Sequence, residues 1–283
     1  MKTGGRALLS LVQSAAVRGS AGEALPTVWQ SLTDAGTVFR RGQLCLVAAG
    51  PGVGKSAFVL SYALQSRVST LYFSADSDAY VQLSRSLAIL GGLTMSEAGE
   101  LALNPDYKRI QAITEGTHVR FDYNSSPTLG SITEQVHAYN EMYGDYPELI
   151  VVDNALDVEA GDAEDQAQSL DELMGWLHDL ARTTEACVVV LHHVTGPYND
   201  SASPIPLSGV KGQIGRVPEL ILTLHKSVAE HGGGDELRVS TVKNRGFRAD
   251  PSGATFVPLA FDGFRMSIKD VQEKVWDDDP FAL

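Results

Sequence analysis

One glycine-rich segment restricts the fold of this chain more than any other part of it. The segment reads Ala49-Gly50-Pro51-Gly52-Val53-Gly54-Lys55-Ser56, and it joins the apolar run Leu44–Ala49 to a stretch of helical periodicity, Lys55–Gln65. Glycines at such a junction let backbone N–H groups converge on phosphate oxygens, and the start of the helix adds partial positive charge. A strand, this loop and a helix in this order predict a phosphate-binding loop in an α/β domain.

Two side chains of the loop have specific expected roles. Lys55 is expected to reach the β- and γ-phosphates of a nucleotide, and the Ser56 hydroxyl is expected to bind Mg²⁺. Ala49 stands where the usual motif has its first glycine, but the later glycines still supply the turn. The alternative is a glycine-rich turn that precedes Gly-Lys-Ser by chance. The expected nucleotide-binding residues are Gly50, Pro51, Gly52, Val53, Gly54, Lys55 and Ser56.

A second apolar run, Leu149–Val152, ends in Asp153. A carboxylate at the tip of a parallel strand beside a phosphate loop is placed to hold Mg²⁺. Taken alone, an aspartate after a strand is more often a helix cap or a turn residue. Together with the phosphate loop, it predicts a magnesium site made by Ser56 and Asp153.

Further short apolar runs alternate with helical stretches along the chain. Runs of this length suit strands buried on both faces, and the intervening helices imply a mainly parallel sheet flanked by helices. The C-terminal third predicts antiparallel strands at 237–243 and 255–261. The expected fold is an α/β nucleotide-binding core over residues 24–270. The other expected strands are 70–74, 188–191 and 220–224, and the other expected helices are 80–90, 132–143 and 165–184.

Composition excludes several classes of protein. No apolar run in the 283 residues reaches the length of about 18 residues that a spanning helix needs, so no membrane association is expected. The two cysteines, Cys45 and Cys187, lie in apolar runs, which excludes a disulfide scaffold and favours a cytoplasmic location. The net charge of −13 argues against a broad basic face for duplex DNA, although nucleic acid in a narrow basic channel stays open.

The order of these elements resembles the RecA-like motor domain of hexameric replicative helicases, namely DnaB and the phage primase-helicases of superfamily 4. The resemblance covers about residues 24–268. It implies a RecA-like P-loop NTPase that uses ATP and Mg²⁺. The motifs that carry it are Leu25-Pro26-Thr27 through Arg41-Gly42-Gln43, the phosphate loop, Tyr72-Phe73-Ser74-Ala75-Asp76, and Gln82-Leu83 with Arg85.

The resemblance also implies catalytic residues at two strand ends. Asp76 stands where the family has a glutamate general base, one methylene longer, and Asp78 is the fallback. Either aspartate could instead cap the next helix. His193, after the strand Cys187–Leu191, matches the position of the family's γ-phosphate sensor, although a histidine at a strand end is more often structural. Metal binding by His192 and His193 together is not expected, because adjacent strand residues point to opposite faces.

Lys243-Asn244-Arg245-Gly246 resembles the family's Lys-x-Arg motif, which projects into the nucleotide site of the neighbouring subunit. Lys243 and Arg245 are therefore expected to act in trans within a homo-oligomer, most simply a hexameric ring. An arginine supplied in this way stabilises the charge that develops on the transferred phosphoryl group. The alternative is an exposed basic turn.

The segment 206–214 resembles the glycine-containing loop with which the family grips single-stranded DNA. Lys211 and Gly212 are the expected DNA contacts, and Arg216 could instead lie near the nucleotide. The loop 159–165 is acidic where the related channel loop is basic, which argues against a processive motor.

The ends of the chain suggest two smaller units. Residues 1–23 predict an N-terminal linker with a helix at 7–17, in place of the family's large N-terminal domain, and the alternative is a frayed cap. Residues 271–283 form an acidic tail with aromatic ends, similar to the tails of single-strand-binding proteins and phage helicases. Such a tail suits a basic pocket on a replisome partner, and the alternative is a solvated terminus.

The expected function is that of an ATP-dependent DNA helicase or translocase of the replicative, DnaB-like type. Three alternatives stay open on sequence grounds. One is a RecA-like recombination or annealing accessory, and a second is a non-catalytic ATP switch. The third is a Mg²⁺-dependent nuclease that uses Asp76, Asp78 and Asp153.

Overall fold

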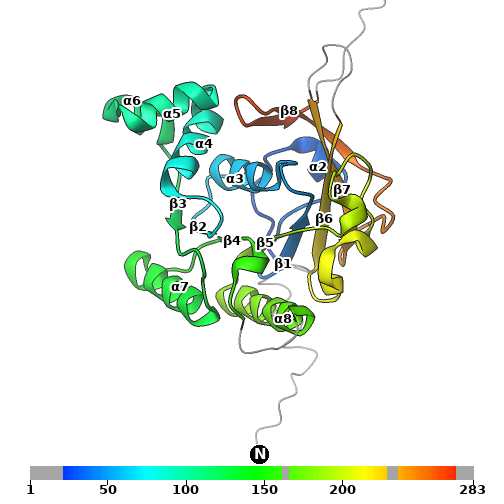
Figure 1. Cartoon of the computed structure of the whole chain (residues 1–283). Helices are drawn as coiled ribbons and strands as arrows, with labels where there is room; N and C mark the ends of the chain where they lie inside the picture. The colour runs from blue at the N-terminus through cyan, green and yellow to red at the C-terminus, as the bar shows by residue number, and fades with distance from the viewer. Residues whose placement is uncertain (1–21, 161–165, 228–234, 272–283) are drawn as a thin grey trace, which may run out of the picture.

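A nine-stranded mixed sheet forms the centre of the molecule (Figure 1). The computed structural model describes residues 22–160, 166–227 and 235–271. The strand order is β3-β2-β4-β5-β1-β6-β7-β8-β9, with parallel pairing from β3 to β6 and antiparallel pairing from β6 to β9. The prediction of a mainly parallel sheet with an antiparallel C-terminal continuation is confirmed. The strands are β1 (Leu44–Ala48), β2 (Thr70–Ser74), β3 (Val119–Asp122), β4 (Leu149–Asp153), β5 (Cys187–His192), β6 (Leu220–Ser227), β7 (Asp235–Asn244), β8 (Val257–Asp262) and β9 (Ser267–Asp270).

Helices cover both faces of the sheet (Figure 1). Helices α3 and α4 pack on one face, and α7 and α8 pack on the other. Helices α4, α5 and α6 share a small core of their own at the β3 edge. The helices are α2 (Gln30–Asp34), α3 (Lys55–Gln65), α4 (Ala79–Gly91), α5 (Met95–Leu103), α6 (Tyr107–Thr114), α7 (Leu129–Tyr143) and α8 (Gln166–Thr184), with the 3-10 turns η1 (Ala155–Asp157), η2 (Gly196–Tyr198), η3 (Leu207–Gly209) and η4 (Lys211–Arg216).

Alternation along the central strands explains why they are apolar throughout. In β1 every residue is buried: Cys45 and Val47 join the core beneath α3, whereas Leu44 and Leu46 join the core beneath α8. A strand covered on both faces has no polar side, as expected for the middle of a parallel sheet. Because β1, β2, β4 and β5 run parallel, their carboxyl ends meet at one edge of the sheet. The loops at that edge are free to bind a ligand.

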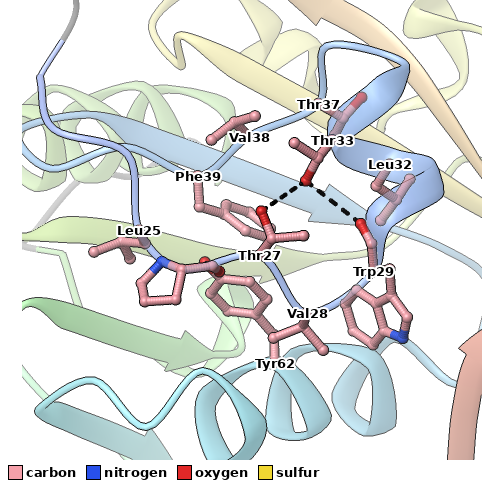
Figure 2. A pocket seen from close by; sticks show the side chains of 11 residues that line it. Leu25, Thr27, Val28, Trp29, Leu32, Thr33, Thr37, Val38, Phe39 and Tyr62 are labelled. Atoms are coloured by element: carbon pink, nitrogen blue, oxygen red, sulfur yellow. Dashed lines mark hydrogen bonds between the residues drawn. The ribbon is translucent and has the colours of Figure 1, made fainter.

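The segment before β1, residues 25–39, packs against α3 and covers the core beneath that helix. The Trp29 ring stacks on Phe58 at 4.6 Å between centroids, and its Nε1 donates to the Ile268 oxygen of β9 at 3.0 Å. The Tyr62 hydroxyl of α3 donates to the Pro26 oxygen at 3.0 Å. Figure 2 shows the apolar hollow between this segment and Tyr62. Its cavity of about 20 Å³ holds little more than one water molecule, so it is a packing contact and not a ligand site.

Several sequence predictions concern residues outside those described. They are the helix at 7–17, most of the acidic loop 159–165, and the acidic tail apart from its first residue.

Cys45 and Cys187 are buried free thiols, in agreement with the absence of a disulfide scaffold. No helix in the described part of the chain has both the length and the apolar character that crossing a membrane requires.

Candidate active site at the carboxyl edge of the sheet

The predicted phosphate loop lies between β1 and α3 with the backbone shape that the sequence requires. Gly52 has φ 74° and Gly54 has φ 115°, left-handed values that residues with a Cβ rarely adopt. Gly54 is also the residue from which α3 starts, so the first N–H groups of that helix face the loop. Pro51 and Gly52 are exposed at the tip. The loop therefore offers backbone donors at a helix N-terminus to an anion.

Gly50 fixes the other side of the loop to a segment far away in the sequence. Its N–H donates to the Ser201 hydroxyl oxygen at 2.8 Å, and Ser201 is almost fully buried. A Cβ at Gly50 would lie 2.0 Å from the Asn199 carbonyl oxygen. Gly50 is thus required for close approach of two backbones, and Ser201 is a site residue that sequence patterns did not single out.

Gly50→Ala is expected to lower the free energy of unfolding by about 1–3 kcal/mol, because the new methyl group must displace backbone atoms. Nucleotide affinity should fall as well, since the loop moves with Gly50. Denaturant unfolding and nucleotide titration measure the two effects. Gly175→Ala in α8 is the matched control: its Cβ would have no neighbour within 4 Å, so we expect it to be neutral or mildly stabilising. Equal behaviour of the two variants would contradict the packing argument.

Lys55 lies at the start of α3 among acidic side chains. Burial lowers its pKa, whereas Asp153, Asp76 and Asp157 act in the opposite direction. Asp157 lies in η1, directly after β4, and its carboxylate accepts from the Asn154 N–H at 3.3 Å. The sequence analysis did not identify Asp157 as a site residue. The arrangement keeps a cation beside the loop where phosphate oxygens would replace part of its lost hydration.

Asp153 closes the site from the end of β4. It is only 3% exposed and lies beside Ser74 of β2 in the strand register. Burial raises the pKa of its carboxyl, and hydrogen bonds from the Ser56 and Tyr72 hydroxyls oppose that shift. The Tyr72 hydroxyl donates to Asp153 Oδ2 at 3.0 Å. Hydroxyl and carboxylate oxygens suit Mg²⁺, which takes few protein ligands and completes its shell with phosphate and water.

A nuclease centre of three carboxylates is not formed. Among the residues that the structure describes, no group of three or more His, Cys, Asp or Glu side chains could hold a metal ion. Asp78 is engaged elsewhere, because its Oδ1 accepts from the Val81 N–H at 2.9 Å and caps α4. Asp76, Asp78 and Asp153 therefore do not make the metal centre that the nuclease alternative requires.

Asp76 and His193 follow β2 and β5, two strands that β4 separates in the sheet. Asp76 is exposed on the turn after β2, and its charge affects the pKa values of Lys55, Asp153 and His193. His193 is half-buried just beyond β5, and burial followed by Lys55 and Lys211 lowers its pKa. The structure thus brings Lys55, Asp76, Asp153 and His193 together, while Asp78 has the capping role.

His192 points to the opposite face, as the strand alternation predicts. It is fully buried, and its Nε2 is 3.0 Å from the Lys211 carbonyl oxygen. Burial lowers its pKa to about 4, so the ring is neutral at neutral pH. The Lys211 N–H in turn donates to the His193 oxygen at 3.2 Å. Both histidines are consequently bonded to the residue predicted to contact DNA.

The predicted DNA segment is partly helical rather than an open loop. Turns η3 and η4 occupy most of it, and a bridge between Val194 and Val210 closes its base. Lys211 is half-buried, and Gly212 is exposed with φ 77°. Arg216 does not lie at the phosphate loop of its own chain: its Nη2 pairs with Asp171 Oδ2 of α8 at 3.2 Å.

Lys243 and Arg245 lie at the opposite ends of the parallel strands, at the level where β6 begins. Asn244 pairs with Leu220, the first residue of β6, whereas Ala48 before the phosphate loop pairs with Thr223. Three strand positions separate the two levels by about 10 Å. Lys243 Nζ donates to the Gly215 and Arg216 oxygens at 2.6 and 2.8 Å. Arg245 Nη2 donates to the Arg216 oxygen at 3.0 Å, and its Nη1 is 3.4 Å from Glu219 Oε1. Neither cation lies beside the phosphate loop of its own chain.

Comparison with known proteins gives a consistent result. Residues 24–231 match the family model of the DnaB-like helicase C-terminal domain. The Gene 65 protein of Mycobacterium phage L5 is 53% identical over 261 residues, which cover 91% of this chain and 97% of that protein. A probable plasmid replicative DNA helicase of Chlamydia trachomatis is 22% identical, and the match spans 90% of this chain and 56% of the relative. A solved DnaB-like replicative helicase, described together with its interactions with primase, superposes with a TM-score of 0.78 at 15% identity over 95% of this chain and 69% of that chain, which shows a shared fold.

Proposed function

Because the chain belongs to the family of DnaB-like helicase C-terminal domains, we propose that it hydrolyses ATP to move along or unwind DNA, with single-stranded DNA as its track. The observation that carries the proposal is the separation of two sets of residues. Lys55, Ser56 and Asp153 lie at one edge of the sheet, and Lys243 with Arg245 lies at the other. A site that needs both sets is complete only between two copies of the chain.

The phosphate loop binds the nucleotide. The backbone from Gly50 through Gly54 and the Lys55 ammonium bind the phosphates, and Ser56 with Asp153 binds Mg²⁺. The metal supplies charge neutralisation of the phosphate oxygens when it is bound. The donor set fits it, because the Ser56 hydroxyl lies near enough to the Asp153 carboxylate to lower its pKa, and hydroxyl and carboxylate oxygens suit Mg²⁺.

Asp76 and His193 are the proposed catalytic residues beside the γ-phosphate. Asp76 orients and deprotonates the attacking water, which can reach its exposed side chain from solvent. His193 contacts the γ-phosphate and reports its presence. Since His193 and His192 both bond to Lys211, loss of that phosphate reaches the DNA contacts Lys211 and Gly212 through a short path.

The assembly and its surroundings complete the proposal. We place the core at residues 24–270 in a homo-oligomer, most simply a hexameric ring, with residues 1–23 as a linker between subunits. The acidic tail 271–283 is assigned to a replisome partner with a basic pocket. Relatives from Mycobacterium phages favour a role in the cytoplasm of an infected bacterial cell.

ATPase and fork-unwinding assays with and without single-stranded DNA, together with the particle mass, test this function. A motor should show ATP turnover stimulated several-fold by DNA, displacement of a strand from a fork, and a mass several times 30.3 kDa. Long filaments with an intact fork would indicate a recombination or annealing accessory instead. A negligible rate of ATP turnover that does not depend on DNA would indicate a non-catalytic ATP switch.

Asp76→Asn is expected to lower the ATP turnover rate by about 10²–10⁴-fold, because general base catalysis typically contributes that much. Nucleotide binding should change little, since Asp76 is not part of the phosphate loop. Asp78→Asn is the matched control: asparagine caps a helix as well as aspartate, so its turnover should stay near wild type. A wild-type rate for Asp76→Asn would move the base to another residue.

A further inference from the structure

The Tyr72 side chain reaches the proposed magnesium ligand from inside the core. Tyr72 is fully buried on β2, and its ring packs against Phe121 of β3 at 5.4 Å between centroids. Its hydroxyl donates to Asp153 Oδ2 at 3.0 Å. A tyrosine hydroxyl in an apolar core needs a partner, and here that partner is the carboxylate at the phosphate loop.

Strand register explains how the two groups meet. Tyr72 lies opposite Val151 in the β2–β4 pair, and Ser74 lies opposite Asp153. Tyr72, Val151 and Asp153 share the face beneath α3, because side chains on one strand repeat every second residue. The tyrosine is long enough to run along this face and end at the carboxylate two positions further on. A phenylalanine would fill the same core space without the hydroxyl.

We propose that Tyr72 is a positioning residue for the magnesium site: its hydroxyl fixes the rotation of the Asp153 carboxylate so that the metal finds its ligand in place. The inference rests on the proposed function, which assigns Asp153 to Mg²⁺. The Tyr72 hydroxyl of β2 donates to this carboxylate, and the Ser56 hydroxyl of α3 lies near enough to lower its pKa. Groups that orient a metal ligand typically change metal affinity about 10–100-fold when they are removed.

Tyr72→Phe removes only the oxygen and tests the role directly. The measured quantity is Mn²⁺ affinity in the presence of a non-hydrolysable ATP analogue. Binding is detected as loss of the free Mn²⁺ signal in electron paramagnetic resonance. We expect Mn²⁺ affinity to fall about 10–100-fold, and the Mg²⁺ concentration for half-maximal ATP turnover to rise by a similar factor, with turnover recovering at high Mg²⁺. Tyr62→Phe is the matched control, because Tyr62 is another buried tyrosine, and its hydroxyl donates to the Pro26 carbonyl oxygen.

Asp153→Asn separates failure of this inference from failure of the proposed function. If Asp153→Asn loses Mn²⁺ affinity while Tyr72→Phe keeps that of wild type, the positioning role is wrong and the magnesium assignment stands. Reduced thermal stability of Tyr72→Phe with unchanged Mn²⁺ affinity would likewise overturn the proposal, because the hydrogen bond would then contribute only to the stability of the core. If Asp153→Asn also keeps wild-type affinity, the assignment of Asp153 to the metal fails first.

Discussion

Lys55→Ala should abolish detectable ATP turnover, with a loss of at least about 10³-fold, because it removes a fixed positive charge from the site of phosphoryl transfer. Among the residues that the structure describes, Lys55 is the only lysine or arginine that is buried. Burial of an ammonium group is unfavourable unless other charges compensate for it. Asp153, Asp76 and Asp157 provide that compensation in the free protein, and the triphosphate would add to it when bound.

The same substitution should weaken the metal site. Lys55 lowers the pKa of Asp153 against the effect of burial, so its removal leaves the carboxyl easier to protonate. Turnover, nucleotide affinity and Mg²⁺ dependence are measured on one preparation. Lys269→Ala on the exposed face of β9 is the control and should behave as wild type. Unchanged ATP hydrolysis in Lys55→Ala would refute the phosphate-loop assignment.

The parts of the fold that the sequence predicted are those in which one local pattern decides the structure. Helix α3 and strand β2 have the predicted bounds, Lys55–Gln65 and Thr70–Ser74. A fully apolar run between turns has few alternatives to a buried strand, and a glycine loop before a helix has few alternatives to a phosphate loop. Local information was sufficient there because burial is complete on both faces.

Elements at the periphery were missed for the opposite reason. Helices α5 and α6 bury little, and Leu103 and Tyr107 are 69% and 78% exposed. Strand β3 is a short edge strand whose residues are half-buried or exposed. Helix α6 buries no residue and α5 buries only three, so neither segment contains the apolar run that predicted the central elements.

Site residues divide in a similar way. Motif positions such as Lys55 and Asp153 follow strands and could be placed by sequence alone. Ser201 and Tyr72 could not, because their partners lie 151 and 81 positions away and only the folded sheet brings them together. Contacts of this kind carry no signal in a single sequence.

Arg245→Ala is expected to leave ATP affinity nearly unchanged and to lower turnover by about 10³–10⁵-fold, the range for an arginine that stabilises the transferred phosphoryl group. The reason is its position at the end of β7, away from the phosphate loop of its own chain. Its side chain is 51% exposed and is held by Glu219 and the Arg216 carbonyl, so it can face a neighbouring copy. Arg248→Ala, three residues further on and also exposed, is the control and should retain turnover.

A mixture of Arg245→Ala with Lys55→Ala distinguishes a shared site from a site within one chain. If one copy supplies the phosphate loop and its neighbour the arginine, random mixing in equal amounts makes about a quarter of the interfaces complete, and ATP turnover returns. If each chain completes its own site, every site in the mixture lacks either Lys55 or Arg245, and no turnover returns. Two inactive proteins that regain activity together would therefore locate Arg245 at the boundary between subunits, whereas continued inactivity at a ring-sized particle mass would remove the basis for the motor function.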